Sequence, residues 1–125
     1  MPTASDAKRS GRPRRTVRAQ VLREESHCWL CDHRVDVTMG PRHPLSPEVD
    51  EIVPVKHGGS TTDRTNLRLA HRICNQTRCA KPATHQVRAT CRAKVELLLN
   101  GGSLPTKARR RPTATQREQR SNPRW

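Results

Sequence analysis

The sequence predicts a small α+β domain held together by a structural zinc ion and flanked by two basic arms. The chain has 125 residues, no Phe, no Tyr, two Trp and a hydrophobic fraction of 31%. Its Cys and His residues occur in spaced pairs, and its short β-branched runs alternate with helical patterns. Because so small and aromatic-poor a core is marginally stable alone, a metal ion is expected to stabilise it.

Two pairs of metal-ligand residues have the spacing of a zinc site. Cys28 and Cys31 form a CxxC pair, and His71 and Cys74 form an HxxC pair in a predicted helical turn. Four such ligands complete a tetrahedral coordination sphere and leave no position open for a substrate or a reactive water. The pattern therefore predicts structural rather than catalytic zinc.

Other Cys and His residues are alternatives as ligands. Cys79 or Cys91 could replace His71, and His27 and His33 flank the CxxC pair. None of them shares the paired spacing, so Cys28, Cys31, His71 and Cys74 remain the preferred set.

Cysteine usage also indicates a compartment. Five Cys is an odd number, and the sequence shows neither an N-terminal apolar signal region nor an apolar run long enough to cross a bilayer. We therefore expect a cytoplasmic protein with reduced thiols, and we disfavour an extracellular disulfide protein.

Most of the formal net charge of +14 is predicted to lie in the arms. Residues 1–20 carry six basic side chains against one acidic, residues 101–125 carry seven against one, and residues 21–100 carry twelve against nine. The terminal segments are also rich in Pro, Ser and Thr, so we expect them to be disordered alone and to bind a polyanion such as nucleic acid. The predicted organisation is a basic arm at 1–15, a domain at 16–100 with its motif core at 28–75, and a basic tail at 101–125.

The expected secondary structure follows from periodicity and from turn residues. Apolar residues at helical spacing predict helices, β-branched runs predict the two strands of a hairpin, and Pro and Gly mark the loops. The expected elements are a helix at 16–25, strands at 35–39 and 49–53, a helix at 66–78 capped by Asp63 or Thr65, and a helix at 85–99.

The motif core resembles the HNH nuclease family. The resemblance rests on Val49-Asp50-Glu51-Ile52-Val53-Pro54, Gly58-Gly59, Asn66-Leu67 and the segment from His71 to Asn75, preceded by Cys28-Trp29-Leu30-Cys31. It implies a ββα-metal fold that cuts nucleic acid. By position, Asp50 and Asn75 resemble the ligands of the catalytic metal, Asn66 resembles the loop Asn that orients the catalytic group, and Glu51 stands where the family normally has a His as general base.

These residue types suit phosphodiester hydrolysis. The reaction needs a base to take a proton from water and a cation to stabilise the charge that develops on the phosphate and the leaving oxygen. The oxygen ligands of Asp50 and Asn75 suit Mg²⁺ or Mn²⁺. A carboxylate such as Glu51 is a weaker base at neutral pH than an imidazole, so His43 or His57, in loops on either side of it, could be the base instead.

The resemblance is closest to small HNH proteins of bacteria and their phages that carry Glu in place of His. It implies an endonuclease that nicks or cuts double-stranded DNA in a bacterial host cell, with phage packaging (terminase) or restriction machinery as further partners. The alternative is a zinc-stapled nucleic-acid-binding module that lost cleavage together with the His.

Overall fold

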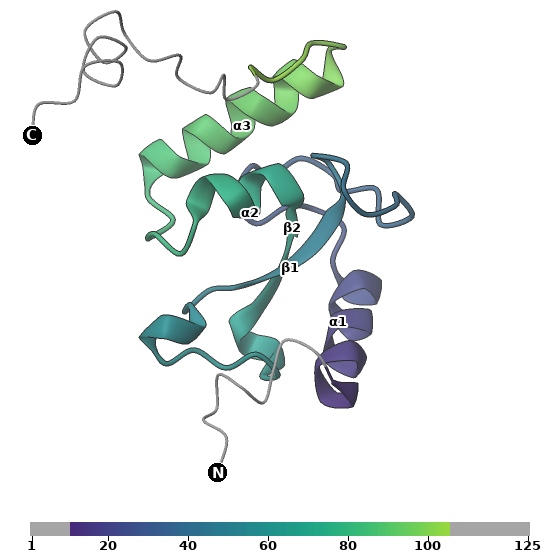
Figure 1. Cartoon of the computed structure of the whole chain (residues 1–125), viewed down its shortest axis with the longest axis vertical. Coiled ribbons are helices and arrows are strands. Elements are labelled where there is room, and N and C mark those ends of the chain that lie inside the picture. The colour runs from purple at the N-terminus through teal and green to yellow at the C-terminus, as the bar shows by residue number, and fades with distance from the viewer. Residues whose placement is uncertain (1–10, 106–125) are drawn as a thin grey trace, which may run out of the picture.

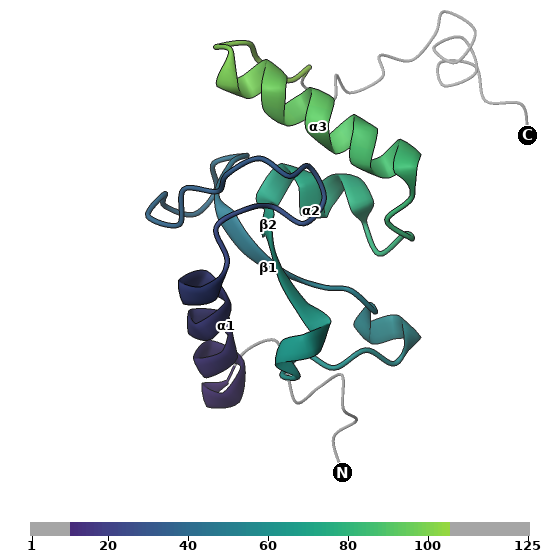
Figure 2. The same cartoon turned by 180° about the vertical axis from the view of Figure 1, so that it is seen from behind.

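Two antiparallel strands lie at the centre of the fold (Figure 1). The structure, a computed structural model, describes residues 11–105. Its elements are α1 (Arg12–Glu24), β1 (Pro47–Glu51), the 3₁₀ helices η1 (Val55–His57) and η2 (Arg64–Asn66), β2 (Leu67–His71), α2 (Arg72–Arg78) and α3 (His85–Leu99). Figures 1 and 2 show α1 beside the strands and α3 across α2. The predicted α+β class and ββα order are confirmed.

The partner of β1 differs from the one predicted. Strand β1 pairs with β2 in a register that joins Pro47 to His71 and Glu51 to Leu67. Leu67 and Leu69 are fully buried while Arg68 between them is exposed. This alternation is the strand pattern, and the sequence-based expectation of one helix over 66–78 was wrong for residues 67–71. The helical part of that segment begins at Arg72, directly after the strand.

The predicted strand at 35–39 is a loop. Its chain turns at Asp36, whose Oδ1 accepts hydrogen bonds from the backbone N–H and the hydroxyl of Thr38. Such a local side-chain bond competes with strand pairing. Just before this loop, His27 and Arg34 form one isolated antiparallel bridge outside the two named strands.

Helix α1 begins earlier than the sequence predicted. It starts at Arg12, with Pro13 in its first turn, where the fixed φ of proline favours a helix and its missing N–H costs nothing. The predicted basic arm at 1–15 is therefore wrong for residues 12–15, which form the first turn of α1. The helix buries Val17, Val21 and Arg14 against the strands.

The last helix has the predicted bounds. Thr84 caps α3 by accepting a hydrogen bond from the N–H of Val87, and Gly101 adopts a left-handed φ of 81° just beyond its end. Cys91 and Val95 of α3 are fully buried. The remaining predicted parts of the arms, 1–10 and 106–125, lie outside the described residues.

The core is aliphatic and sulfur-rich. Among the described residues its fully or nearly fully buried apolar side chains are Val17, Val21, Leu30, Val35, Val49, Leu67, Leu69, Ala70 and Val95, together with Cys28, Cys31, Cys74 and Cys91. Without a buried aromatic ring, this set removes little apolar area from water, so the cysteine cluster within it has to contribute to stability. No helix within residues 11–105 combines the length and the apolar character needed to cross a membrane.

Candidate metal centre and active-site pocket

The four predicted zinc ligands form one cluster in the core. The sulfur atoms of Cys28, Cys31 and Cys74 and a ring nitrogen of His71 all lie within 4.8 Å of one another. All four residues are buried, with at most 2% of their surface exposed. Three thiols and an imidazole are a donor set that Zn²⁺ binds tetrahedrally, so the cluster fits a structural zinc ion.

The orientation of His71 suits metal binding through Nδ1. Its Nδ1 lies 3.3 Å from Sγ of Cys31, and its Nε2 lies 3.1 Å from the carbonyl oxygen of Arg34. Because a carbonyl only accepts hydrogen bonds, Nε2 carries the proton and the lone pair of Nδ1 faces the sulfurs. A backbone partner of this kind fixes the tautomer of metal-binding histidines.

Crowding of the thiols makes their protonation unequal. Hydrogen bonds from Cys31 and Cys74 lower the pKa of Cys28, while the hydrogen bond shared with Cys28 raises the pKa of Cys31. A thiolate at Cys28 thus makes it harder to form a second thiolate at Cys31. A bound Zn²⁺ would offset this repulsion between thiolates, because its charge stabilises several of them at once.

The alternative ligands lie outside the cluster. Cys79 is exposed, and Cys91 donates its S–H to the carbonyl of Cys74. His33 pairs with Glu96, and His27 contacts Ser26. The paired spacing therefore identified the four residues that the structure brings together in one cluster.

A second site is a pocket of about 230 Å³ at the end of β1. Its lining brings together three of the four predicted catalytic residues, Asp50, Glu51 and Asn75, with two arginines that the sequence analysis did not single out, Arg14 and Arg78. Strand β1 supplies the two carboxylates, α2 supplies Asn75 and Arg78, and α1 supplies Arg14. The pocket is thus lined by two acidic and two basic side chains.

Glu51 is the least satisfied group in the pocket. It is 9% exposed, and its Oε1 has no hydrogen-bond partner within the described part of the chain. The nearest cationic group is the guanidinium of Arg14, whose Nη2 lies 3.8 Å away. Burying a carboxylate oxygen that accepts no hydrogen bond is costly, so its position beside Asp50 and Asn75 fits a site for a divalent cation or its bound water.

Asp50 is held by two donors. Its Oδ2 accepts hydrogen bonds from Nη1 of Arg78 at 2.8 Å and from the indole N–H of Trp29 at 3.1 Å. Burial raises the pKa of Asp50, and the neighbouring carboxylate of Glu51 adds to this, whereas Arg78 and Trp29 act in the opposite direction. One oxygen of this predicted metal ligand is therefore already engaged by the protein.

Arg78 joins the end of β1 to α2. It is 3% exposed, stacks over the Trp29 ring at 5.0 Å, and donates to the carbonyl oxygens of Glu51 and Ile52. Its guanidinium thus fixes the backbone that carries both acidic residues. We identify it as a structural clamp on the pocket.

Asn75 presents an oxygen ligand. Its Nδ2 donates to Oε1 of Glu48 at 2.8 Å, which leaves Oδ1 as the amide atom able to bind a cation. Asn75 is half-buried in the first turns of α2, three residues before Arg78. Asn75 thus lines the same pocket as Asp50 and Glu51, and its role as a metal ligand stays a prediction.

Asn66 lies outside this pocket. Its Oδ1 accepts from the N–H of Val53, and its Nδ2 donates to the carbonyls of Val53 and Ser60. The loop that it closes passes so near Val53 that a Cβ on Gly59 would lie 1.6 Å from the Val53 carbonyl oxygen. Asn66 therefore pins the chain that leaves β1 and lies apart from the lining residues.

Comparison with protein families identifies the segment that contains both sites. Residues 28–81 match the model of the HNH endonuclease family. This segment belongs to the HNH endonuclease family. No curated protein and no solved structure matched the chain. The HNH segment includes the zinc cluster, both acidic residues, Asn66, Asn75 and Arg78, whereas Arg14 lies before it.

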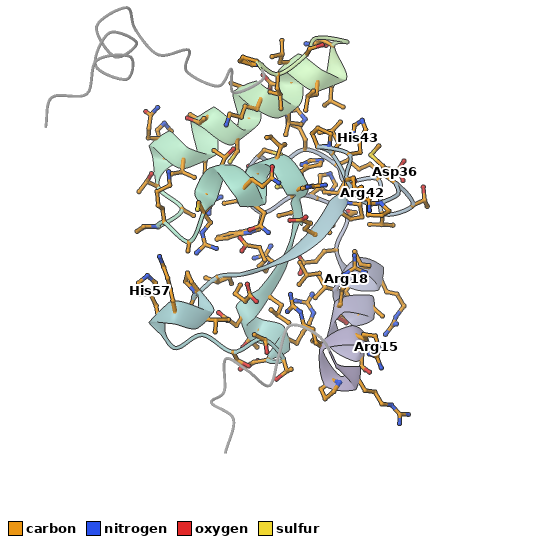
Figure 3. All side chains as sticks on the ribbon, viewed as in Figure 1. Arg15, Arg18, Asp36, Arg42, His43 and His57 are labelled. Carbon is orange, nitrogen blue, oxygen red and sulfur yellow. The ribbon has the colours of Figure 1, made fainter. Side chains whose placement is uncertain are left out.

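The two candidate loop histidines do not line the HNH pocket. His43 accepts a hydrogen bond from the N–H of Leu45 in the loop before β1, and His57 ends η1 after β1. Figure 3 shows the two on opposite sides of the molecule. Glu51 is the only one of the three candidate bases that lines the pocket.

Arg14 and Arg78 were missed for different reasons. Arg78 follows Asn75 by three residues in a helix, a spacing that puts both on one face, so it could have been found. Arg14 was assigned to an arm. Pro13 is typical of a first helical turn, and this signal in the sequence could have placed Arg14 in the folded domain.

Proposed function

We propose that the protein is a divalent-metal-dependent endonuclease that hydrolyses phosphodiester bonds of double-stranded DNA. An HNH domain indicates a nuclease-type function. The observation that carries the finer proposal is the buried Oε1 of Glu51, which accepts no hydrogen bond within residues 11–105 and lies in a pocket shared with Asp50 and Asn75. This grouping supports one base and two oxygen ligands around the reacting phosphate.

In this proposal Glu51 is the general base. Its Oε1 takes a proton from the attacking water, whose oxygen forms the new bond to phosphorus while the bond from phosphorus to the 3′ oxygen breaks. The leaving 3′ oxygen is then protonated from solvent. An ionised carboxylate is a weaker base than imidazole, so we expect slower cleavage than a His base would support.

Asp50 and Asn75 would hold Mg²⁺ or Mn²⁺, which supplies charge stabilisation at the phosphate. Asp50 remains anchored through Oδ2 to Arg78 and Trp29, so its orientation is preset. Asn66 acts as a positioning residue, since it fixes the loop that follows β1. Through Cys74, the zinc cluster holds α2, and with it Asn75, against the turn of residues 28–31.

Plasmid cleavage tests this proposal. Supercoiled plasmid is incubated with the full chain and Mg²⁺, Mn²⁺ or no divalent cation, and nicked and linear products are quantified. We expect metal-dependent products, with a rate that falls by about 100-fold or more in Glu51→Gln, the usual scale of general-base catalysis. The matched control is Glu96→Gln on the exposed face of α3, which should cut like the parent.

A second function is favoured by one observation. Oδ2 of Asp50 is already occupied by Arg78, an arrangement that also suits a zinc-stapled module that binds nucleic acid without cutting it. If no cation gives products while the parent chain binds the plasmid DNA, this second function replaces the first.

A further inference from the structure

A basic groove continues from the active-site pocket. It measures about 660 Å³, lies between α1, the loop of residues 36–46 and the start of β1, and shares Arg14 and Val49 with the pocket. Arg18, Arg42 and Arg72 line it, with Glu48 as its acidic residue. The groove is thus strongly positive and adjoins the pocket of Glu51 at Arg14 and Val49.

The three groove arginines are not neutralised by the domain. Within residues 11–105, the side chains of Arg18, Arg42 and Arg72 form no hydrogen bond, ion pair or ring contact. Elsewhere, by contrast, Arg64 and Arg68 pair with glutamates. Guanidinium groups left unpaired along a groove suit an anionic partner.

Their placement comes from α1 and the loop that faces it. Arg14 and Arg18 are one helical turn apart, so α1 presents both along the same face. Figure 3 shows Arg18 on α1 and Arg42 on the neighbouring loop, on one side of the molecule. Two segments far apart in sequence therefore contribute cations to one groove.

The backbone of Arg42 adds a second observation. Its φ is 79°, a left-handed value that glycine adopts freely and that costs an arginine about 1 kcal/mol or more. The strained position carries a long cationic side chain at the groove, where glycine would be less strained. This points to a use for the guanidinium outside the folding of the domain.

We propose that this groove binds the phosphodiester backbone of one DNA strand next to the phosphate held in the pocket. The proposal rests on the proposed function and adds the path of the substrate. Arg18, Arg42 and Arg72 contact successive phosphates, and Arg14 lines both the groove and the pocket. Because these contacts reach the backbone, they position the DNA without reading its sequence.

The test measures binding without cleavage. A short fluorescein-labelled DNA duplex is titrated with the full chain by fluorescence anisotropy at several salt concentrations, without added Mg²⁺ or Mn²⁺. We expect the double variant Arg18→Ala, Arg42→Gly to bind the duplex roughly tenfold more weakly than the parent. Because it loses two phosphate contacts, the negative slope of log affinity against log salt should become less steep by about two, one per contact. Glycine at position 42 accommodates the left-handed backbone, so the thermal unfolding midpoint should not fall.

The matched control removes the same charge from two positions of α1 that lie outside the groove. Arg12 and Arg23 are exposed on α1, outside the groove, and Arg12→Ala, Arg23→Ala should retain nearly the parental salt slope. Equal losses in the two double variants would overturn the groove and leave net charge as the cause. Parental affinity in the groove variant would also overturn it. Since no cleavage is measured, either result stands whether or not the protein proves to be a nuclease.

Discussion

Nη2 of Arg14 lies 3.8 Å from Oε1 of Glu51, which brings a helix from outside the HNH segment to the candidate base. Arg14 is 8% exposed and also donates to the carbonyl oxygens of Thr61 and Val49. A single side chain of α1 therefore ties the helix to β1 and to the loop before β2.

The first prediction concerns the boundary of the domain. Deleting residues 1–15 should lower the unfolding midpoint strongly, because the first turn of α1 and Arg14 are lost. Arg14→Ala should lower the free energy of unfolding by about 2 kcal/mol or more, since buried carbonyls lose a charged donor. Arg15→Ala, exposed beside it, should change it by less than about 0.5 kcal/mol. Denaturant titration measures both, and equal effects would contradict the assignment.

The second prediction concerns zinc. Elemental analysis should find about one Zn per chain, and Cys28→Ser or Cys74→Ser should leave the domain largely unfolded, because structural zinc binding supplies folding free energy. Cys79→Ser, at an exposed position outside the cluster, should keep both the metal and the circular-dichroism spectrum. A metal-free chain that still unfolds cooperatively at the same temperature would show that the cluster is not a zinc site.

The third prediction concerns the identity of the base. The rate of plasmid cleavage should show no inflection near pH 6.5, because a carboxylate base is already ionised below neutrality, whereas an imidazole base titrates there. His43→Ala and His57→Ala should cut at close to the parental rate. A variant of either histidine that loses cleavage, together with an active Glu51→Gln, would transfer the role of base to that histidine.

The fourth prediction separates positioning from chemistry at Asn66. Asn66→Ala removes three hydrogen bonds and should lower the free energy of unfolding by about 1 to 3 kcal/mol. The amide of Val53 should then exchange faster with deuterium, because its acceptor is gone. Val53 protection equal to the parent's would mean that the loop does not depend on Asn66.

The fifth prediction concerns pH and the contact between α1 and β2. Burial alone would raise the pKa of Glu25, but hydrogen bonds from the N–H of Leu69 and from Arg68 and Arg64 outweigh it and hold this pKa below its usual value of 4.5. A carboxyl whose pKa is lower in the folded chain stabilises it above the unfolded pKa and loses that effect as the pH falls through the folded pKa.

Glu25→Gln should therefore lower the free energy of unfolding by about 1 kcal/mol at neutral pH, a value reduced by solvent screening. The difference from the parent should vanish as the pH falls below 4.5 and through the folded pKa. The comparison is Glu24→Gln, whose exposed ion pair with Arg64 should contribute less. A loss that is independent of pH would contradict the electrostatic explanation.

The sequence by itself determined the features that depend on local spacing. The paired ligands Cys28, Cys31, His71 and Cys74 needed only the geometry of two short turns, and α3 needed only its cap and its apolar face. The placement of Asp50 and Glu51 in a strand, and the resemblance to the HNH family, followed from contiguous motifs, although the strand ends at Glu51 rather than at the predicted residue 53.

The tertiary structure decided what depends on pairing between distant segments. Residues 67–71 form a strand because β1 pairs with them, and only 67–69 alternate between buried and exposed, so this short run alone did not distinguish strand from helix. Arg14 belongs to the pocket because α1 starts at Arg12 and packs its buried face on the strands. The basic groove arises in the same way: Arg18 of α1, Arg42 of the loop before β1 and Arg72 of α2 line one groove because the fold brings these distant segments together, which the sequence order does not contain.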